Sequence, residues 1–248
     1  MSSTIKVNLE RDSYDIIFDD NFVESAIALI GTSSKCMIIT QEVIYKAFEE
    51  KFSALKSLPN VEFHFIGQGE KAKSIETAIE ICDKMTLMHY DRSSTIFAVG
   101  GGVVGDTAGF VASIFMRGID YIQYPTTLLA MVDSSIGGKT GVNLKSGKNL
   151  IGRIHQPKAV IIDLSFLDTL PQREINASLA EAIKYGFIYD RELFNYIVEN
   201  ISDILSAKNQ TALKKIILRS CEIKSEVVSK DVNEDNIRMI LNFGHTIG

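Results

Sequence analysis

Tryptophan is absent from this sequence of 248 residues, and proline (4) and cysteine (3) are scarce. Cys36, Cys82 and Cys221 are far apart and odd in number, which fits reduced thiols in a cytoplasmic protein better than a disulfide framework. The sequence has no uninterrupted run of about 18 apolar residues, so we expect no membrane span. Residues 1–15 lack the charged-then-apolar order of a signal peptide, which also favours the cytoplasm.

The charge balance is slightly acidic, with 26 Lys and Arg against 31 Asp and Glu and a net charge of -5. This balance argues against a nucleic-acid-binding surface, although it leaves room for a local basic pocket. Hydrophobic residues make up 46% of the chain, which excludes general disorder. The length suits one large domain or two modest ones.

Hydrophobic periodicity divides the chain into two parts. Residues 5–18 alternate as a β-hairpin does, and short apolar runs then alternate with helical stretches. The runs are Cys36–Thr40, Thr95–Val99, Tyr121–Tyr124 and Val160–Ile162, and the helical stretches are 42–54, 74–88 and 103–115. This order predicts a Rossmann-like α/β domain, a mostly parallel sheet with helices on both faces, over residues 1–170.

After Pro171 the β signals end. The helices expected there are 172–188, 190–206, 210–229 and 234–247. They predict an all-α second domain over residues 171–248, which we expect to be incomplete at its C-terminal end.

A glycine-rich turn follows the expected strand Thr95–Val99. Gly100, Gly102 and Gly105 match G-x-G-x-x-G between a strand and a helix, which predicts a tight turn that holds a dinucleotide pyrophosphate at a helix N-terminus. The same glycines would also serve a turn needed only for close strand–helix packing. Upstream, Glu70 and Lys73 offer a carboxylate for ribose hydroxyls and an ammonium for phosphate, or form an exposed charged loop.

Residues 133–140 imitate a phosphate-binding loop of the Walker A type. The first glycine of that motif is replaced by Asp133, whose carboxylate would repel the phosphates, so we exclude ATP binding there. The surrounding region is polar and glycine-rich, and it includes Lys139, Lys148 and Asn149. These donors suit an anionic substrate, although a solvated loop fits the pattern equally well.

The expected helix 210–229 carries Lys224 on the same stripe as Ile217, Cys221 and Val228. Lysines are rarely buried without a partner, so Lys224 is either paired in the interior or extends from the edge of the stripe into water.

Two further helices carry residues suited to a metal and an anion. Arg238, Asn242 and His245 stand at i, i+4 and i+7, and Glu181 and Lys184 at i and i+3. The simpler interpretations are a solvated polar face and a surface ion pair. A catalytic zinc site usually takes three protein ligands. Glu181 and His245 provide two, and we expect the third beyond residue 248.

Together these blocks resemble the 3-dehydroquinate synthase family over nearly the whole chain. The matching blocks are Gly100–Asp106, Met116–Gly118, Pro125–Thr140, Gly147–Gly152, Phe166–Pro171, Ala180–Lys184 and Leu241–Gly248. One departure lies after the second strand of the α/β domain. Thr40-Gln41-Glu42 stands there instead of the expected acidic residue and asparagine, which leaves the adenosine contacts open.

The resemblance implies roles for particular residues. NAD+ would contact Glu70, Lys73, Gly102, Val103, Val104, Gly105, Asp106, Thr126, Thr127, Lys139, Lys148, Phe166 and Thr169. A divalent metal, Zn2+ or Co2+, would be held by Glu181 and His245. The substrate's phosphate and carboxylate would be held by Lys139, Asn149, Lys184, Lys224, Arg238 and Asn242. Asp133 would lie near the nicotinamide and the metal. Arg117 would reach the neighbouring subunit of a homodimer.

The resemblance also implies the reaction, a lyase step of the shikimate pathway of aromatic biosynthesis. The sugar phosphate 3-deoxy-D-arabino-heptulosonate 7-phosphate is converted to 3-dehydroquinate and phosphate through transient oxidation by NAD+, phosphate elimination, re-reduction and an intramolecular aldol step. Three alternatives stay open. They are a cyclase for another sugar phosphate, a metal-dependent polyol dehydrogenase, and an inactive NAD-binding fragment.

Overall fold

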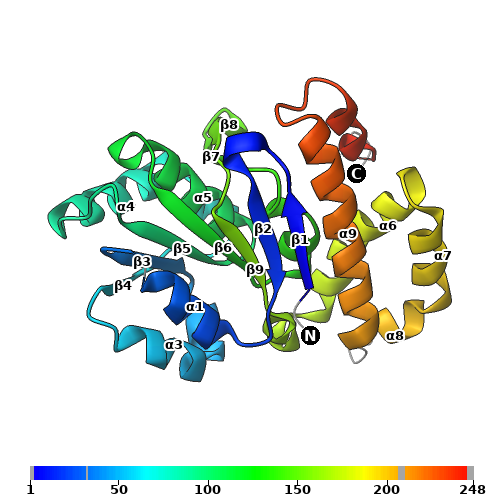
Figure 1. Cartoon of the computed structure of the whole chain (residues 1–248), viewed down its shortest axis with the longest axis horizontal. Helices are drawn as coiled ribbons and strands as arrows, with labels where there is room; N and C mark the ends of the chain where they lie inside the picture. The colour runs from blue at the N-terminus through cyan, green and yellow to red at the C-terminus, as the bar shows by residue number, and fades with distance from the viewer. Residues whose placement is uncertain (1–2, 32, 206–209, 245–248) are drawn as a thin grey trace.

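The computed structural model describes residues 3–31, 33–205 and 210–244. A seven-stranded sheet with the order β1-β2-β9-β6-β5-β3-β4 forms its centre (Figure 1). All neighbouring strands are parallel except β1 and β2, which form the predicted N-terminal hairpin. The strands are β1 (Ser3–Val7), β2 (Tyr14–Phe18), β3 (Cys36–Thr40), β4 (Val61–Phe65), β5 (Thr95–Gly100), β6 (Asp120–Pro125) and β9 (Ala159–Ile162).

Helices cover both faces of the sheet, as predicted for a mostly parallel arrangement (Figure 1). On β3, Ile38 belongs to the core beneath α1 and α3, whereas Met37 and Ile39 belong to the core beneath α4 and α5. Burial on both faces explains why the strand is apolar without alternation. The helices of this part are α1 (Phe22–Ile30), α2 (Glu42–Ala47), α3 (Glu49–Lys56), α4 (Ile75–Leu87) and α5 (Gly102–Ile114), with short 3-10 turns η1 (Glu10–Asp12), η2 (Glu70–Ala72) and η3 (Phe115–Arg117).

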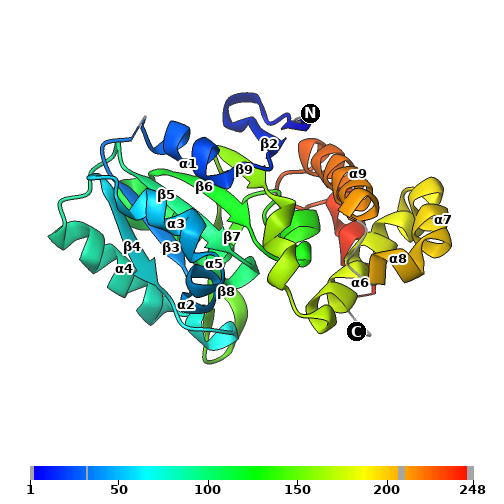
Figure 2. The same cartoon turned by 90° about the horizontal axis from the view of Figure 1, so that it is seen from below.

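From Gln172 onward the described chain forms helices and turns, with no strand. The elements are α6 (Gln172–Ile188), α7 (Arg191–Glu199), α8 (Ile201–Leu205), α9 (Gln210–Lys230) and the 3-10 turn η6 (Ile237–Asn242), and η5 (Leu164–Thr169) joins them to the sheet. Figure 2 shows α6 to α9 grouped beside one end of the sheet. One hydrophobic cluster runs from Ile161 on β9 to Tyr185 on α6 and Ile217 on α9. The domain boundary near residue 170 stays a prediction. None of the described helices is long and apolar enough to cross a membrane.

Two predicted helices are interrupted. Residues 42–54 form α2 and α3, which meet at Phe48 with φ -129° and ψ 36°. The Phe48 ring packs against Phe166 at 4.7 Å between centroids, and this contact stabilises the interruption between the two helices. The described part of the expected helix 190–206 forms α7 and α8 around Asn200, whose side-chain amide donates to the carbonyl of Tyr196 and ends α7.

The prediction of an α-helix over residues 234–247 was wrong for the described part. The carboxylate of Asp231 accepts hydrogen bonds from the backbone N–H groups of Asp235, Asn236 and Arg238, at 3.0, 2.7 and 3.0 Å. These bonds hold a compact turn, and only the 3-10 turn η6 follows it. The remaining residues of that expected helix, including His245, lie outside the described residues.

The region predicted as a polar loop is instead a hairpin of β7 (Lys139–Leu144) and β8 (Gly147–Ile154). Gly141 faces Gly152 across it, and a Cβ on Gly152 would lie 2.2 Å from the carbonyl oxygen of Thr140. The two glycines therefore allow the strands to approach closely. β8 is largely exposed, so its sequence lacks the apolar alternation of a half-buried strand.

The N-terminal hairpin and α9 lie side by side although they are far apart in sequence (Figure 1). Ser225 donates from its hydroxyl to the carbonyl of Lys6, and the N–H of Asn8 donates to Ser229, both at 3.2 Å. The Tyr14 hydroxyl on β2 accepts from the N–H of Gly137 at 3.0 Å. The first two strands thus support both α9 and the turn before β7.

Candidate active site

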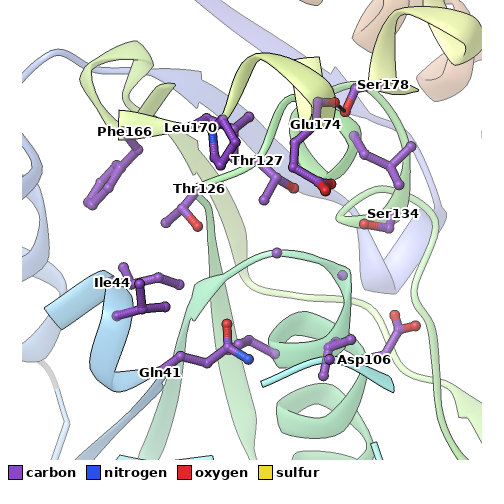
Figure 3. A pocket seen from close by; sticks show the side chains of 18 of the residues that line it. Gln41, Ile44, Asp106, Thr126, Thr127, Ser134, Phe166, Leu170, Glu174 and Ser178 are labelled. Carbon is purple, nitrogen blue, oxygen red and sulfur yellow. Dashed lines mark hydrogen bonds between the residues drawn. The ribbon is translucent and has the colours of Figure 1, made fainter. Parts of the chain in front are cut away.

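A cavity of about 640 Å³, here called cavity A, opens at the carboxyl ends of the parallel strands (Figure 3). In open α/β sheets ligands bind at this edge. Residues just after four strands line it, namely Gln41 after β3, Gly101 after β5, Thr126 after β6 and Phe166 after β9.

The glycine turn between β5 and α5 serves close packing and also places a helix N-terminus at cavity A. A Cβ on Gly100 would meet Val104 at 2.4 Å, and one on Gly105 would meet the Gln123 amide oxygen at 2.5 Å, so these two glycines are needed for packing. Gly102 begins α5 and lines cavity A. The N–H of Gly105 donates to the carbonyl of Gly101, so the N–H groups of residues 102–104 belong to the first turn of α5. A helix offers these groups no carbonyl of its own, which makes them suited to an anion.

A buried charge cluster forms part of the wall of cavity A. The Lys73 ammonium is 4% exposed and donates to Asp106 and to the side-chain oxygen of Asn149, both at 2.5 Å. Burial raises the pKa of Asp106, and the charge of Lys73 opposes this rise. Glu70 lines the cavity and accepts from the Asn143 amide at 2.6 Å.

A second cavity of about 580 Å³, cavity B, adjoins the first, and Asp106, Ser134 and Asn149 line both. Its remaining lining residues are Asp133, Ile136, Lys139, Thr140, Gly141, Leu150, Gly152, Arg153, Ile154, Lys224 and Arg238. Four of these carry a positive charge against one further carboxylate, so cavity B suits a polyanion.

Asp133 lies at the centre of the charged groups of cavity B. The ammonium of Lys224 donates to its carbonyl and to its carboxylate, both at 2.6 Å, and the Tyr185 hydroxyl donates to the same carboxylate at 2.7 Å. Burial alone would raise the pKa of Asp133, but Lys224 and Tyr185 outweigh it and hold the pKa at about 2. The position of Lys224 on the apolar stripe therefore reflects a buried, paired ammonium.

Arg238 and Lys139 carry two of the other charges. Arg238 is 2% exposed and donates to the carbonyls of Val232 and Gly137 at 2.7 and 3.3 Å. Gly137 has φ 97°, and a Cβ there would lie 2.4 Å from the guanidinium. Lys139 forms an ion pair with Glu234. Burial and the nearby charges of Arg238 and Lys224 lower the pKa of Lys139 to about 8.

The predicted metal-binding helix places Glu181 and Lys184 together as an ion pair on α6. Lys184 is buried and also donates to the carbonyl of Leu241 at 2.6 Å. Within residues 3–31, 33–205 and 210–244, no three His, Cys, Asp or Glu side chains gather as metal ligands. The prediction that Asn242 shares a face with Arg238 was wrong, because Asn242 is exposed and donates to Glu234 at 2.7 Å.

Most residues predicted to contact NAD+ lie along cavity A. They are Glu70, Lys73, Gly102, Val103, Val104, Asp106, Thr126, Thr127, Phe166 and Thr169. Gly105 is packed behind the turn, and Lys148 is exposed on β8, outside the lining of both cavities. Arg117 is exposed in η3, at the opposite end of α5 from Asp106. The individual roles of these residues stay predictions.

Sequence reasoning missed part of the lining of cavity A. Ile44 and Phe48 come from the α2–α3 region, and Glu174 and Ser178 extend from the first turns of α6 toward the cavity (Figure 3). Nothing in their local sequence distinguishes these residues from ordinary helix positions. Ser134 was also missed, although it lies directly after Asp133.

Comparisons with known proteins agree with this architecture. The family described as 3-dehydroquinate synthase N-terminal matches residues 63–177, and 3-dehydroquinate synthase C-terminal matches residues 178–248. A 3-dehydroquinate synthase of Caldanaerobacter subterraneus subsp. tengcongensis is 51% identical over 98% of this chain, which spans 69% of that relative.

Two solved structures share the fold. A 2-epi-5-epi-valiolone synthase from Streptomyces hygroscopicus subsp. jinggangensis is 31% identical, with a TM-score of 0.84 over 94% of this chain and 66% of the other. A 2-deoxy-scyllo-inosose synthase is 28% identical, with a TM-score of 0.87 over 99% of this chain and 69% of the other. The two family matches and the relative that is 51% identical show that the chain belongs to the 3-dehydroquinate synthase family.

Proposed function

We propose that this chain binds NAD+ in cavity A and 3-deoxy-D-arabino-heptulosonate 7-phosphate in cavity B, and that it serves the conversion of this sugar phosphate to 3-dehydroquinate and phosphate. The observation that carries the proposal is the junction of the two cavities at Asp106, Ser134 and Asn149. A dinucleotide in cavity A would end beside an anion held in cavity B.

The lining of cavity A fits a dinucleotide. The free amides at the start of α5 suit the pyrophosphate, and Glu70 offers a carboxylate to ribose hydroxyls. The solved 2-epi-5-epi-valiolone synthase is described with NAD+ and Zn2+ bound. When bound, NAD+ supplies a reversible hydride acceptor and a divalent cation supplies a Lewis acid.

Cavity B would position the substrate by charge. Lys139, Arg153, Lys224 and Arg238 line it, and their side chains suit the phosphate and carboxylate of the sugar acid. Lys224 is fixed by Asp133, and Arg238 by two backbone carbonyls, so these cations are already oriented before an anion enters. Prior orientation lowers the cost of holding a flexible polyanion in one reactive conformation.

Glu181 fits one ligand of a divalent cation, because it is a half-buried carboxylate on α6 beside the buried Lys184. Its ion pair with Lys184 would be exchanged for the cation. His245 would supply imidazole nitrogen, and it lies outside the described residues. Zn2+ and Co2+ both accept this combination of oxygen and nitrogen ligands.

Homodimer formation and a cytoplasmic location are part of the same proposal. α5 is about 20 Å long, as judged from the rise per residue, and Arg117 follows its far end. Arg117 and Met116 both have positive φ, 70° and 50°, so the backbone is held in an unusual turn that presents the arginine outward. A side chain there is suited to a neighbouring subunit rather than to its own cavities.

The rival cyclases act on other sugars, and the polyol dehydrogenases would release NADH. The 51% identity to a 3-dehydroquinate synthase favours the keto-acid phosphate as substrate over the substrates of the other cyclases and of the polyol dehydrogenases. The third alternative, a fragment that binds NAD+ without turnover, differs from the proposal only in activity.

The test has two parts. Calorimetric titration of the chain with NAD+ and then with Zn2+ measures binding by itself. Release of inorganic phosphate and formation of 3-dehydroquinate are then followed with the sugar acid phosphate, with and without a chelator. We expect NAD+ binding and chelator-sensitive turnover. Binding without turnover would support the inactive fragment. Turnover that persists after metal removal, or bulk accumulation of NADH, would contradict the proposed reaction.

A further inference from the structure

We propose that Ser134 is a cofactor-binding residue whose hydroxyl donates a hydrogen bond to the phosphates of the dinucleotide. This inference rests on the proposed function, because it takes NAD+ as the occupant of cavity A. None of the sequence patterns points to Ser134.

The hydroxyl of Ser134 is buried and has no hydrogen-bond partner within the described ranges. Its neighbour Ser135 is also buried, but the Ser135 hydroxyl donates to the carbonyl of Ala130 at 2.7 Å. A buried hydroxyl without a partner carries a desolvation penalty that folding alone does not offset. A ligand that bonds to Ser134 would remove this penalty, whereas Ser135 already has its partner.

The position of Ser134 beside the start of α5 indicates that the ligand group is a phosphate. Its hydroxyl oxygen would lie 3.1 Å from a Cβ built on Gly102, so it stands directly against the first residue of α5. The free amides at this helix N-terminus and the hydroxyl are therefore neighbours in one wall of cavity A. In Figure 3 the Ser134 side chain is directed toward the interior of the cavity. Backbone N–H groups beside a hydroxyl form a donor set for phosphate oxygens.

The local backbone turns Ser134 toward the glycine turn, although Ser134 also borders cavity B. Ala130–Ser134 forms a π-helical turn, a distortion often found at functional sites. Asp133 on this turn bonds to Lys224 and Tyr185, whereas Ser134, one residue later, faces Gly102. Asp133 thus lines cavity B, whereas Ser134 lies at the junction of both cavities and directly against the glycine turn, so Ser134 is assigned to the cofactor.

The test compares three ligands in calorimetric titrations of the wild-type chain and Ser134→Ala. NAD+ and ADP-ribose share the pyrophosphate, and adenosine lacks it. A hydrogen bond to a charged group predicts that Ser134→Ala weakens NAD+ and ADP-ribose alike by about 10- to 100-fold and leaves adenosine unchanged. Ser134→Cys should show a smaller loss, because a thiol is a weak donor. The melting temperature of ligand-free Ser134→Ala should equal or exceed that of the wild type.

Ser135→Ala is the matched control. It should lower the ligand-free melting temperature and weaken all three ligands to a similar small degree. Three results would overturn the assignment. These are unchanged NAD+ binding in Ser134→Ala, a loss confined to NAD+ with normal ADP-ribose binding, and a ligand-free destabilisation that matches Ser135→Ala. If the wild-type chain binds neither NAD+ nor ADP-ribose, the proposed function itself fails.

Discussion

The buried pair of Lys224 and Asp133 makes a strong prediction about stability. Lys224→Met keeps the apolar stem of the side chain and removes the ammonium. Of the hydrogen bonds to the Asp133 carboxylate from described residues, the one from the Tyr185 hydroxyl then remains. Removing one member of a buried ion pair typically costs about 3–5 kcal/mol of unfolding free energy, because the other charge stays buried without compensation.

The pKa of Asp133 gives a second measure of the same interaction. A decrease from 3.8 to about 2 corresponds to about 2.4 kcal/mol in favour of the folded state. The sign follows from the lower folded pKa, because this contribution is complete above about pH 4 and is lost as the pH falls through 2. In Lys224→Met, burial raises this pKa instead. The deficit of the variant should therefore be larger at pH 7 than near pH 4.

Urea unfolding at pH 7 and near pH 4 measures the cost of Lys224→Met and its pH dependence. In a chain of this size, the melting temperature of Lys224→Met should be about 6–20 °C lower than that of the wild type at neutral pH. Lys230→Met is a matched control, because Lys230 lies on the same helix in an exposed ion pair with Glu226 and should cost less than about 1 kcal/mol. Adding Asp133→Asn to Lys224→Met should recover part of the stability. The reasoning is refuted if Lys224→Met costs no more than the control, or if the double variant is no more stable than Lys224→Met.

Two further perturbations address the walls of cavity B. Gly152→Ala should lower the unfolding free energy by about 2 kcal/mol or more, because its Cβ would press on the rigid carbonyl of Thr140. A loss below about 0.5 kcal/mol, the size of a neutral surface change, would contradict this close approach. Lys139, with a pKa of about 8, should lose its charge as the pH rises from 7 to 9. Calorimetric binding of inorganic phosphate should weaken over that range and stay steadier in Lys139→Arg, and equal pH profiles for the two proteins would refute the role of Lys139.

Local sequence was sufficient to predict an element of the fold or the site where all the residues of that element come from one short segment. The strand–glycine–helix order predicted one wall of cavity A, because the backbone N–H groups at the start of α5 belong to the same short segment as the glycines. The apolar stripe around Lys224 left two alternatives open, a paired lysine in the interior or one that extends into water. The structure shows the buried alternative, with the partner Asp133 far away in sequence. The apolar runs of β3 and β5 predicted a sheet covered on both faces.

The failures share a different cause, since each depends on contacts between distant segments. The β7–β8 hairpin has glycines in close contact and an exposed second strand, so no alternation marks it. The turn before η6 is determined by Asp231, whose carboxylate takes backbone N–H groups that an α-helix would have used. Glu174 and Ser178 line cavity A only because α6 starts beside the ends of the strands.

The contact between the N-terminal hairpin and α9 has a consequence for how the chain folds. β1 is the edge strand, and its far side is covered only when residues near Ser225 and Ser229 have been made. During synthesis from the N-terminus, β1 therefore stays uncovered until more than 200 further residues have been made, and contacts of such long range slow folding. An exposed edge strand is also a site for pairing with other chains. Aggregation of nascent or truncated products should begin at this hairpin.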